Sequence, residues 1–293
     1  MQPTLVWLTP TLMALVLWGL GQGFVKKWIS EVPPARFCLY FVAAKALVNI
    51  GYFLTQEHPP PFAPEGMRFL LVTVFAYVLD GLGWILYFES IVAGPIAIVG
   101  TLSAAYPALT VLFAGIFLRE KLGAIQYVAV ALVIIGCLGL SYAPPDPNAK
   151  ATRKRWIPFA AAALILWAIS QTIVKWSSEL PNSNAGNQAL FNTFGSMLTL
   201  GVYGLLKGRK GVHSVREWTK SFLPMGMLAA GDLGVIIGLA RGPASLVSPI
   251  SGAYPVVTLI FAALVLKERI TLLQIVSVTL IVVGIVFSPG LPK

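Results

Sequence analysis

The sequence predicts an all-α integral membrane protein of ten transmembrane helices, arranged as two inverted five-helix repeats. Three observations support this fold class. Of the 293 residues, 57% are hydrophobic and only 11% are charged, whereas soluble domains carry roughly 25% charged residues. Apolar segments long enough to cross a bilayer recur along the chain. The two halves also resemble each other at an offset of 148 or 149 residues. A water-soluble globular protein is therefore excluded.

The expected helices follow the apolar segments in order. A span needs about 20 apolar residues, and uncharged segments of that kind lie at 1–25, 90–118, 122–145, 156–174, 180–206, 242–266 and 270–292. Three more apolar segments each contain an internal ionisable residue, namely 35–55 with Lys45, 68–90 with Asp80, and 220–240 with Asp232. The first repeat is expected to occupy residues 1–145 and the second 156–293.

The repeat is visible in matched motifs. Near the fourth helix, GP, AYP and LREK of the first half match GP, AYP and LKER of the second. Each repeat holds an odd number of spans, so the second copy must enter the bilayer with the opposite orientation. Inverted repeats of this kind are the architecture of many secondary transporters, whose binding sites lie near the bilayer midplane.

The first helix of each repeat carries a matched polar stripe. Its residues are spaced i, i+4, i+8 and share one helix face; they are Trp18, Gln22 and Lys26, and Trp167, Gln171 and Lys175. Amide and ammonium groups can bind a carboxylate or phosphate. Such a stripe would favour solutes with an anionic group. Lysines near helix ends can instead extend to the lipid headgroups, so both interpretations of the two end lysines stay open.

The AYP motifs predict a second matched pair of polar positions. A proline inside a helix removes one backbone hydrogen bond and kinks the helix, so Pro107 should free the carbonyl of Ser103 and Pro255 that of Ser251. With Tyr106 and Tyr254, these serines are candidate solute-binding residues beside a midplane cavity. The alternative is that the prolines only bend the helices and the serines allow close packing.

Lys45, Asp80 and Asp232 are expected near the bilayer centre, where a charge costs at least about 2.5 kcal/mol. They are therefore candidates for solute binding or coupling. Lys45 and Asp80, on consecutive helices, could alternatively form a structural ion pair. Asp232 has no basic residue inside its own helix, and its repeat equivalent is Trp84. We expect Asp232 to bind a cationic group of the solute or a coupling proton.

Buried amides extend the candidate set. Gln188 and Asn192 share a helix face, and Asn49 lies in the second span. These amides could line the cavity or tie helices together. The surplus of ten positive charges lies mostly between spans, where it indicates lipid contact and topology rather than nucleic-acid binding. Glu89 and Arg241 are expected at the interface, and the charged clusters 119–121 and 267–269 are expected to fix helix ends at the headgroups.

Motifs for other chemistry are missing from the sequence. There is no GxxxxGK[ST] phosphate loop and no HExxH pair. The sequence shows no recognisable catalytic set of a nucleophile, a general base and a residue that orients the base. The sequence therefore predicts no enzyme, no cofactor and no metal site.

Segments 94–122 and 240–271, which contain the AYP and L[RK]E[KR] motifs, are similar to the C-terminal part of an EamA repeat. The chain from about residue 11 to 288 resembles ten-helix EamA-type members of the drug/metabolite transporter superfamily. The resemblance implies export or exchange of small metabolites, amino acids or drugs through a central cavity. With the inverted repeats and the polar positions, the sequence predicts a secondary transporter that moves small polar metabolites, such as amino acids or carboxylates, by alternating access, with proton-coupled export as one form. The alternative is a lipid-carrier flippase, which needs a cavity open sideways to lipid.

The expected partners are a small-molecule substrate and the lipid bilayer, with a homodimer as an open alternative. The expected location is a prokaryotic plasma membrane. Orientation stays open at this point, because the loop charges favour both termini outside whereas the family resemblance implies both in the cytoplasm.

Overall fold

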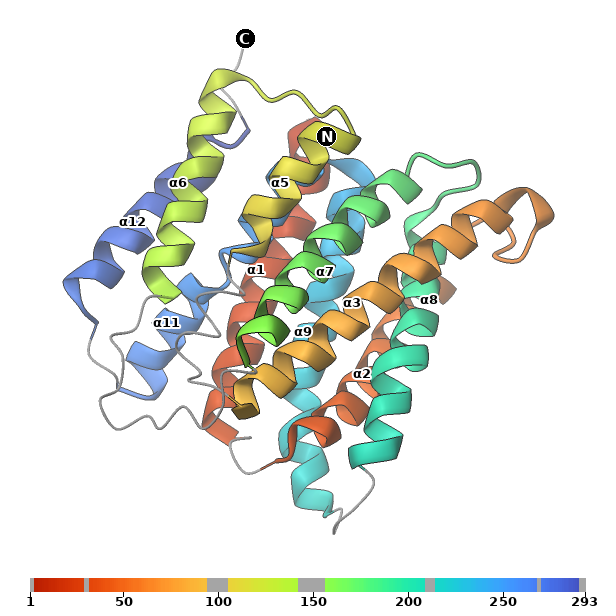
Figure 1. The fold of residues 1–293 in the computed structure, drawn as a ribbon, viewed down its shortest axis with the longest axis horizontal. Coiled ribbons are helices and arrows are strands. Elements are labelled where there is room, and N and C mark those ends of the chain that lie inside the picture. The colour runs from red at the N-terminus through yellow and green to blue at the C-terminus, as the bar shows by residue number, and fades with distance from the viewer. Residues whose placement is uncertain are drawn as a thin grey trace.

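A computed structural model describes residues 3–28, 32–93, 105–141, 156–208, 214–267 and 270–289. Within these ranges every regular element is a helix and none is a strand. The helices lie side by side in a bundle, and α1 begins at the same end of the bundle at which α12 ends (Figure 1). The all-helical part of the expected fold class is thereby confirmed.

Five α-helices lie in the described part of the first half, and Pro34 begins the second of them at a position where a proline costs no helical hydrogen bond. The helices are α1 (Pro3–Trp28), α2 (Pro34–Thr55), α3 (Met67–Ala93), α5 (Tyr106–Phe117) and α6 (Ala124–Ser141). The expected boundary at residue 90 is wrong, because α3 continues to Ala93. Glu89 lies about one turn before this end, and its carboxylate accepts hydrogen bonds from Tyr203 and Lys207.

The second half contains α7 (Trp156–Ser177), α8 (Ala185–Ser196), α9 (Val215–Arg241), α10 (Ala244–Gly252), α11 (Pro255–Val265) and α12 (Leu272–Phe287). The expected start of a span at residue 180 is wrong. The Asn184 side chain accepts hydrogen bonds from the backbone N–H groups of Gly186 and Asn187 and begins α8 there. Two π-helical segments, Met197–Gly201 and Gly204–Gly208, continue α8.

Six helical segments of the described residues are long and apolar enough to cross a membrane, and three shorter apolar helices accompany them, at Tyr106–Phe117, Ala124–Leu140 and Leu272–Phe287. Large apolar side chains cover the outside of the bundle; Leu206 is 74% exposed and Leu264 76%. An exposed apolar surface on helices long enough to span a bilayer marks contact with lipid. The chain is therefore an integral, multi-pass membrane protein, and the number of ten spans stays a prediction.

The AYP motif of the second half breaks its helix. α10 ends at Gly252 and α11 begins at Pro255. The expectation of a free Ser251 carbonyl is wrong, because the Tyr254 N–H donates to it at 3.3 Å. The chain makes a tight turn instead of a bend, and the turn satisfies the carbonyl. In the first half, Pro107 is the second residue of α5, and Ser103 lies outside the described ranges.

Equivalent helices of the two halves pack reciprocally. α1 packs along α9 while α7 packs along α3, and α6 packs against α12. The last pair approaches closely at two equivalent glycines. A Cβ on Gly136 would lie 2.7 Å from the Ser277 carbonyl oxygen, and one on Gly284 would lie 2.6 Å from that of Ala129. The two halves thus use the same surfaces on each other, as a two-fold relation requires.

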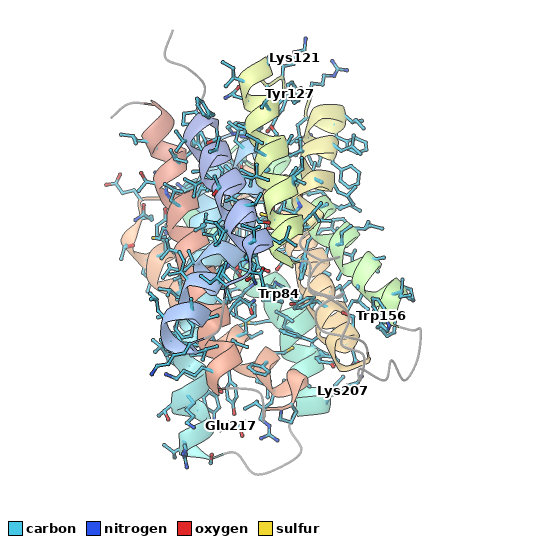
Figure 2. The ribbon with its side chains drawn as sticks, turned by 90° about the vertical axis from the view of Figure 1, so that its left-hand side faces the viewer. Trp84, Lys121, Tyr127, Trp156, Lys207 and Glu217 are labelled. Carbon is cyan, nitrogen blue, oxygen red and sulfur yellow. The ribbon has the colours of Figure 1, made fainter. Side chains whose placement is uncertain are left out.

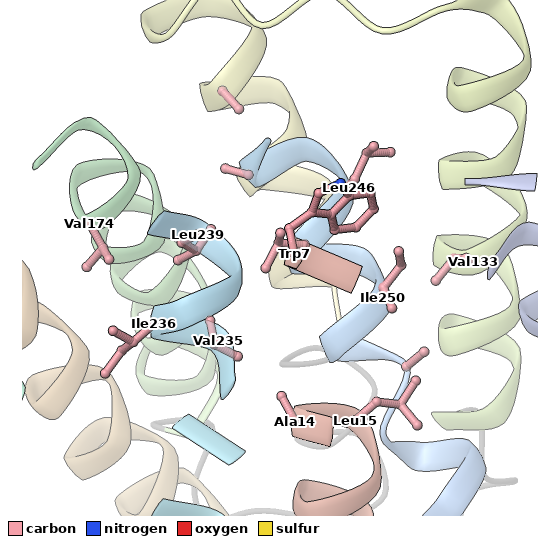
Figure 3. Close-up of a cluster of buried hydrophobic side chains, with 14 of the residues drawn as sticks. Trp7, Ala14, Leu15, Val133, Val174, Val235, Ile236, Leu239, Leu246 and Ile250 are labelled. Atoms are coloured by element: carbon pink, nitrogen blue, oxygen red, sulfur yellow. The ribbon is translucent and has the colours of Figure 1, made fainter. Parts of the chain in front are cut away.

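The largest buried apolar cluster joins the two halves. Figure 3 shows Trp7 of α1 beside Leu246 and Ile250 of α10, with Ala14 and Leu15 further along α1. The cluster continues along α9 through Val235, Ile236 and Leu239. It fixes α1, α9 and α10 relative to one another beside the polar centre of the bundle.

The two L[RK]E motifs form the same turn. Arg119 and Lys267, the second residue of each motif, have φ of 55° and 57°. Side chains other than glycine rarely adopt this left-handed conformation. It ends α5 and α11 directly after Leu118 and Leu266, as a C-terminal cap does. The repeat is therefore kept in backbone conformation as well as in sequence.

Candidate functional site: a cavity between the two halves

A cavity lies between the two halves of the bundle. Its lining side chains come from α1, α3 and α5 of the first half and from α7, α8, α9 and the start of α11 in the second. Its free space of about 70 Å³ exceeds the 10–15 Å³ that one water molecule needs. Trp84, one of its lining residues, lies between the end marked by Lys121 and the end marked by Glu217 (Figure 2). The cavity is therefore central and wide enough for water.

Three charged side chains meet at this cavity. The Lys45 ammonium, on α2, lies 2.8 Å from the Asp232 carboxylate and 3.5 Å from that of Asp80. Lys45 is fully buried and lies behind the two acids, which line the cavity. Its remaining contacts are the Ser196 hydroxyl at 3.4 Å and the face of Phe41 at 4.6 Å. We call Lys45, Asp80 and Asp232 the charge cluster.

Asp232, whose own helix supplies no basic residue in its interior, has a basic partner from another helix. The basic residue that pairs with it comes from α2, and the Trp18 indole N–H also donates to its carboxylate at 2.9 Å. Hydropathy places a residue at a depth but does not show which helices face each other. The Lys45–Asp80 ion pair, which the sequence offered as an alternative, does form, and at 3.5 Å it is longer than the 2.8 Å pair of Lys45 with Asp232.

The two equivalent tryptophans differ in their hydrogen bonding. The Trp18 N–H has two acceptors, Asp232 and the Leu228 carbonyl oxygen at 3.1 Å. The buried Trp167 N–H has no acceptor among the described residues. The position equivalent to Asp232 is Trp84, and its ring packs 5.1 Å from that of Trp167. The donor of Trp167 is therefore free for another acceptor at the cavity wall.

Aromatic rings form the wall beside Asp80. Trp84 lies one helical turn after Asp80, on the same face of α3. The Trp167 ring packs against Trp84, against Tyr87 at 5.4 Å and against Tyr106 at 5.8 Å. We call these four rings the aromatic wall. Across the cavity, Tyr254 packs edge-on to Trp18 at 5.9 Å.

Most of the candidate residues predicted from the sequence lie on this cavity. Besides the two acids, its lining includes Trp18, Gln22, Tyr106, Trp167, Gln171, Asn192 and Tyr254. Lys175, in the last turn of α7, is not among the lining residues, and its ammonium lies 4.0 Å from the carboxylate of Glu179, just after the helix. This position agrees with the interfacial alternative.

Three further candidates do not reach the cavity or cannot be placed. The Ser251 hydroxyl donates to the Val247 carbonyl oxygen of its own helix at 2.8 Å and is not among the lining residues. The Lys26 side chain and Ser103 lie outside the described part of the chain. Other lining residues were missed, notably Tyr77, Trp84 and Ser170. Tyr77 and Trp84 could have been found, because they lie one turn before and after Asp80.

The buried amides hold helices together around the cavity. The Asn49 amide donates to the Asn192 oxygen at 2.9 Å and to the Thr193 hydroxyl at 3.3 Å, which joins α2 to α8. The Gln188 amide donates to the Val174 carbonyl oxygen and to two serines at the end of α7. Gln188 therefore ties helices, whereas Asn192 both ties helices and lines the cavity.

Polar contacts join the two halves at each end of the bundle. At one end, the Arg36 guanidinium of α2 binds both carboxylate oxygens of Glu217 on α9, at 3.0 and 2.8 Å. At the other, Glu120 accepts hydrogen bonds from the backbone N–H groups of Ala244 and Ser245 and from the Ser245 hydroxyl. Glu120 thus caps α10 of the opposite repeat. The expected headgroup role of cluster 119–121 is wrong for this glutamate, whose partners are protein.

The comparisons with known proteins identify the family. The model of the EamA-like transporter family matches residues 5–142 and again residues 154–288. The chain belongs to the EamA-like transporter family. This is a family of membrane transporters, and the two matches to its model explain why the two halves share motifs, packing and turns.

Two further similarities accompany the family match. An uncharacterized protein of Methanocaldococcus jannaschii is 37% identical over 60 residues, which cover 20% of this chain and 44% of that protein. One crystal structure of a protein superposes with a TM-score of 0.75 at 19% sequence identity, covering 96% of this chain and 97% of that chain. The superposition shows that the fold extends over nearly the whole chain.

Proposed function

We propose that this EamA-like transporter is a secondary transporter that carries a small organic solute through its central cavity by alternating access. The observation that carries the proposal is the composition of the cavity wall, because α1 and α3 of one half and α7 and α9 of the other all contribute to it. A shift of one half against the other would change access to such a site from one end of the bundle to the other.

The reciprocal packing of α1 on α9 and of α7 on α3 supports an inverted two-fold relation between the halves. Exchanging the conformations of two such halves converts a cavity open to one side into a cavity open to the other. The contacts at the two ends of the bundle, Arg36 with Glu217 and Glu120 with α10, would then break and form in turn.

The charge cluster is the proposed coupling site. Two carboxylates share one ammonium, so the cluster carries one uncompensated negative charge when all three groups are ionised. A buried charge without a partner is costly. A proton, or a cationic group of the solute, would balance it. We propose a prokaryotic plasma membrane, across which a proton gradient could drive such exchange, as the location.

The sequence-based expectation of a preference for anionic solutes rested on lysines and amides, and the described lysines do not support it. The Lys26 side chain lies outside the described part of the chain. Lys45 is neutralised by two acids, and Lys175 lies outside the cavity lining. The polar groups that remain are amides, hydroxyls and indole donors, which bind neutral or charged solutes alike.

A solute screen in proteoliposomes tests the proposal. We expect uptake or exchange of at least one small metabolite, and we expect a proton gradient to change its rate. Gln171→Ala should reduce uptake roughly two- to tenfold, the cost of one hydrogen bond, whereas Gln56→Ala, an exposed glutamine, should not. Translocation of headgroup-labelled lipid with no transport of soluble solutes would contradict the proposal and support a flippase.

A further inference from the structure

We propose that the cavity selects solutes with a cationic ammonium group on an apolar or aromatic body, and that Asp80 is the carboxylate that binds this group in exchange for a proton. The proposal rests on the proposed transport function and names its substrate class. Three features of the cavity support it: the sign of its charge, the unequal hydrogen bonding of its two acids, and the rings beside Asp80.

The charge of the cavity has a definite sign. Its lining residues, as far as the structure describes them, include two aspartates but no lysine, arginine or histidine. Lys45 lies behind the acids and is fully buried, so a solute in the cavity meets the carboxylates first. One positive charge against two negative ones favours a cation and opposes a carboxylate or phosphate.

The two carboxylates differ in the groups that contact them and in their exposure. The Asp232 carboxylate has the Lys45 ammonium at 2.8 Å and the Trp18 N–H at 2.9 Å, and its side chain is 10% exposed. The Asp80 carboxylate has only the Lys45 ammonium, at 3.5 Å, and its side chain is 21% exposed. Among the described residues no other group donates a hydrogen bond to Asp80. Asp80 is therefore the carboxylate that can exchange its partner.

The rings beside Asp80 suit the rest of such a solute. The aromatic wall begins at Trp84, one turn along the same face of α3, and continues to Trp167 and Tyr106. Aromatic faces attract ammonium groups and pack against apolar rings. The unpaired Trp167 N–H and the unpaired oxygen of the Gln171 amide would bind polar substituents of the solute.

Competition with protons follows from this arrangement. The titratable groups that face Asp80 are Lys45 of α2, Asp232 of α9, Tyr77 of its own helix and Tyr106 of α5. Protonation of Asp80 leaves a neutral cluster, in which Lys45 is balanced by Asp232. Acidification should therefore expel the ammonium group, and binding of the ammonium group should release a proton.

Binding of three matched probes to the purified wild-type protein tests the proposal. They are 2-phenylethylamine, 3-phenylpropionate and 2-phenylethanol, which share a ring and differ in charge. We expect the amine to bind at least about tenfold more tightly than the other two, the effect of one hydrogen bond to a charged group. Its affinity should fall as the pH is lowered. Tighter binding of the anion, or an amine affinity that does not change with pH, would overturn the proposal.

Variants assign the effect to Asp80. Asp80→Asn should weaken amine binding at least about tenfold and remove its pH dependence, whereas Asp80→Glu should retain the preference for the amine. Glu179→Gln, at an exposed acid just after α7, should behave as wild type. Asp80→Asn with wild-type amine affinity would refute the assignment, and the wild-type probe series decides the cation preference even if a variant does not fold.

The failure of this proposal and that of the transport function are distinguishable. Proteoliposomes that carry an anionic solute but no amine would refute the cation selectivity and leave the transport function intact. Amine binding with no transport of any solute would refute the transport function and leave the cation site intact.

Discussion

Replacing Lys45 with methionine should destabilise the protein strongly, because it leaves two acids buried without their cation. The side chain is fully buried, with carboxylates at 2.8 and 3.5 Å. Breaking a buried ion pair by removing one partner costs about 3–5 kcal/mol. At an effective dielectric constant of about 20, the gross attractions are roughly 6 kcal/mol to Asp232 and roughly 5 kcal/mol to Asp80. Asp232 should therefore couple more strongly to Lys45 than Asp80 does.

A double-mutant cycle measures this difference. Lys45→Met is combined with Asp232→Asn and, separately, with Asp80→Asn, and the free energy of unfolding is followed in mixed micelles of increasing SDS content. We expect coupling energies of about 0.5–3 kcal/mol, with the larger value for Asp232. Effects that add to within about 0.5 kcal/mol in both cycles would refute the reasoning.

Three further predictions concern single contacts. Trp18→Phe removes two hydrogen bonds, one to a carboxylate, and should lower the free energy of unfolding by about 1.5–3 kcal/mol. Trp167→Phe removes no hydrogen bond among the described residues, and loss of its N–H should lower the free energy of unfolding by less than about 1 kcal/mol. Equal losses for the two variants in chemical unfolding would contradict the difference in hydrogen bonding. Glu120→Gln weakens the cap on α10 and should lower the melting temperature, a prediction that an unchanged melting curve would refute. Gly284→Ala forces α12 away from α6 and should lower the free energy of unfolding by about 1–3 kcal/mol. Gly51→Ala, where an added Cβ meets only open space, should be neutral or stabilising. Similar losses of stability at both glycines would disprove the close approach of α6 and α12.

Much of the cavity wall could be predicted from the sequence, because equivalent polar residues occur at matched positions in both repeats. Gln22 and Gln171 occupy equivalent positions, as do Tyr106 and Tyr254, and all four line the cavity. A polar residue that recurs on the same face of an apolar helix needs a polar environment. Because the pattern occurs in both halves, this polar environment is expected in the interior that the two halves share.

The contacts within the site could not be predicted, because they depend on which helices face each other. The pairing of Lys45 with Asp232 joins α2 to α9, and the bond from Trp18 to Asp232 joins α1 to α9. Hydropathy gives the depth of each residue but no such pairing. The cap that Glu120 places on α10 was missed for the same reason, since its charged neighbours in the sequence indicated headgroup contact.

Thiol labelling from both sides of the membrane tests the central claim of alternating access through this cavity most directly. With Cys38 and Cys137 replaced by alanine, Gln22→Cys places a single thiol on the cavity wall. In oriented vesicles, a membrane-impermeant maleimide should label this thiol from either side, and a transported solute should change both rates. Labelling from one side only, under all conditions, would contradict the account.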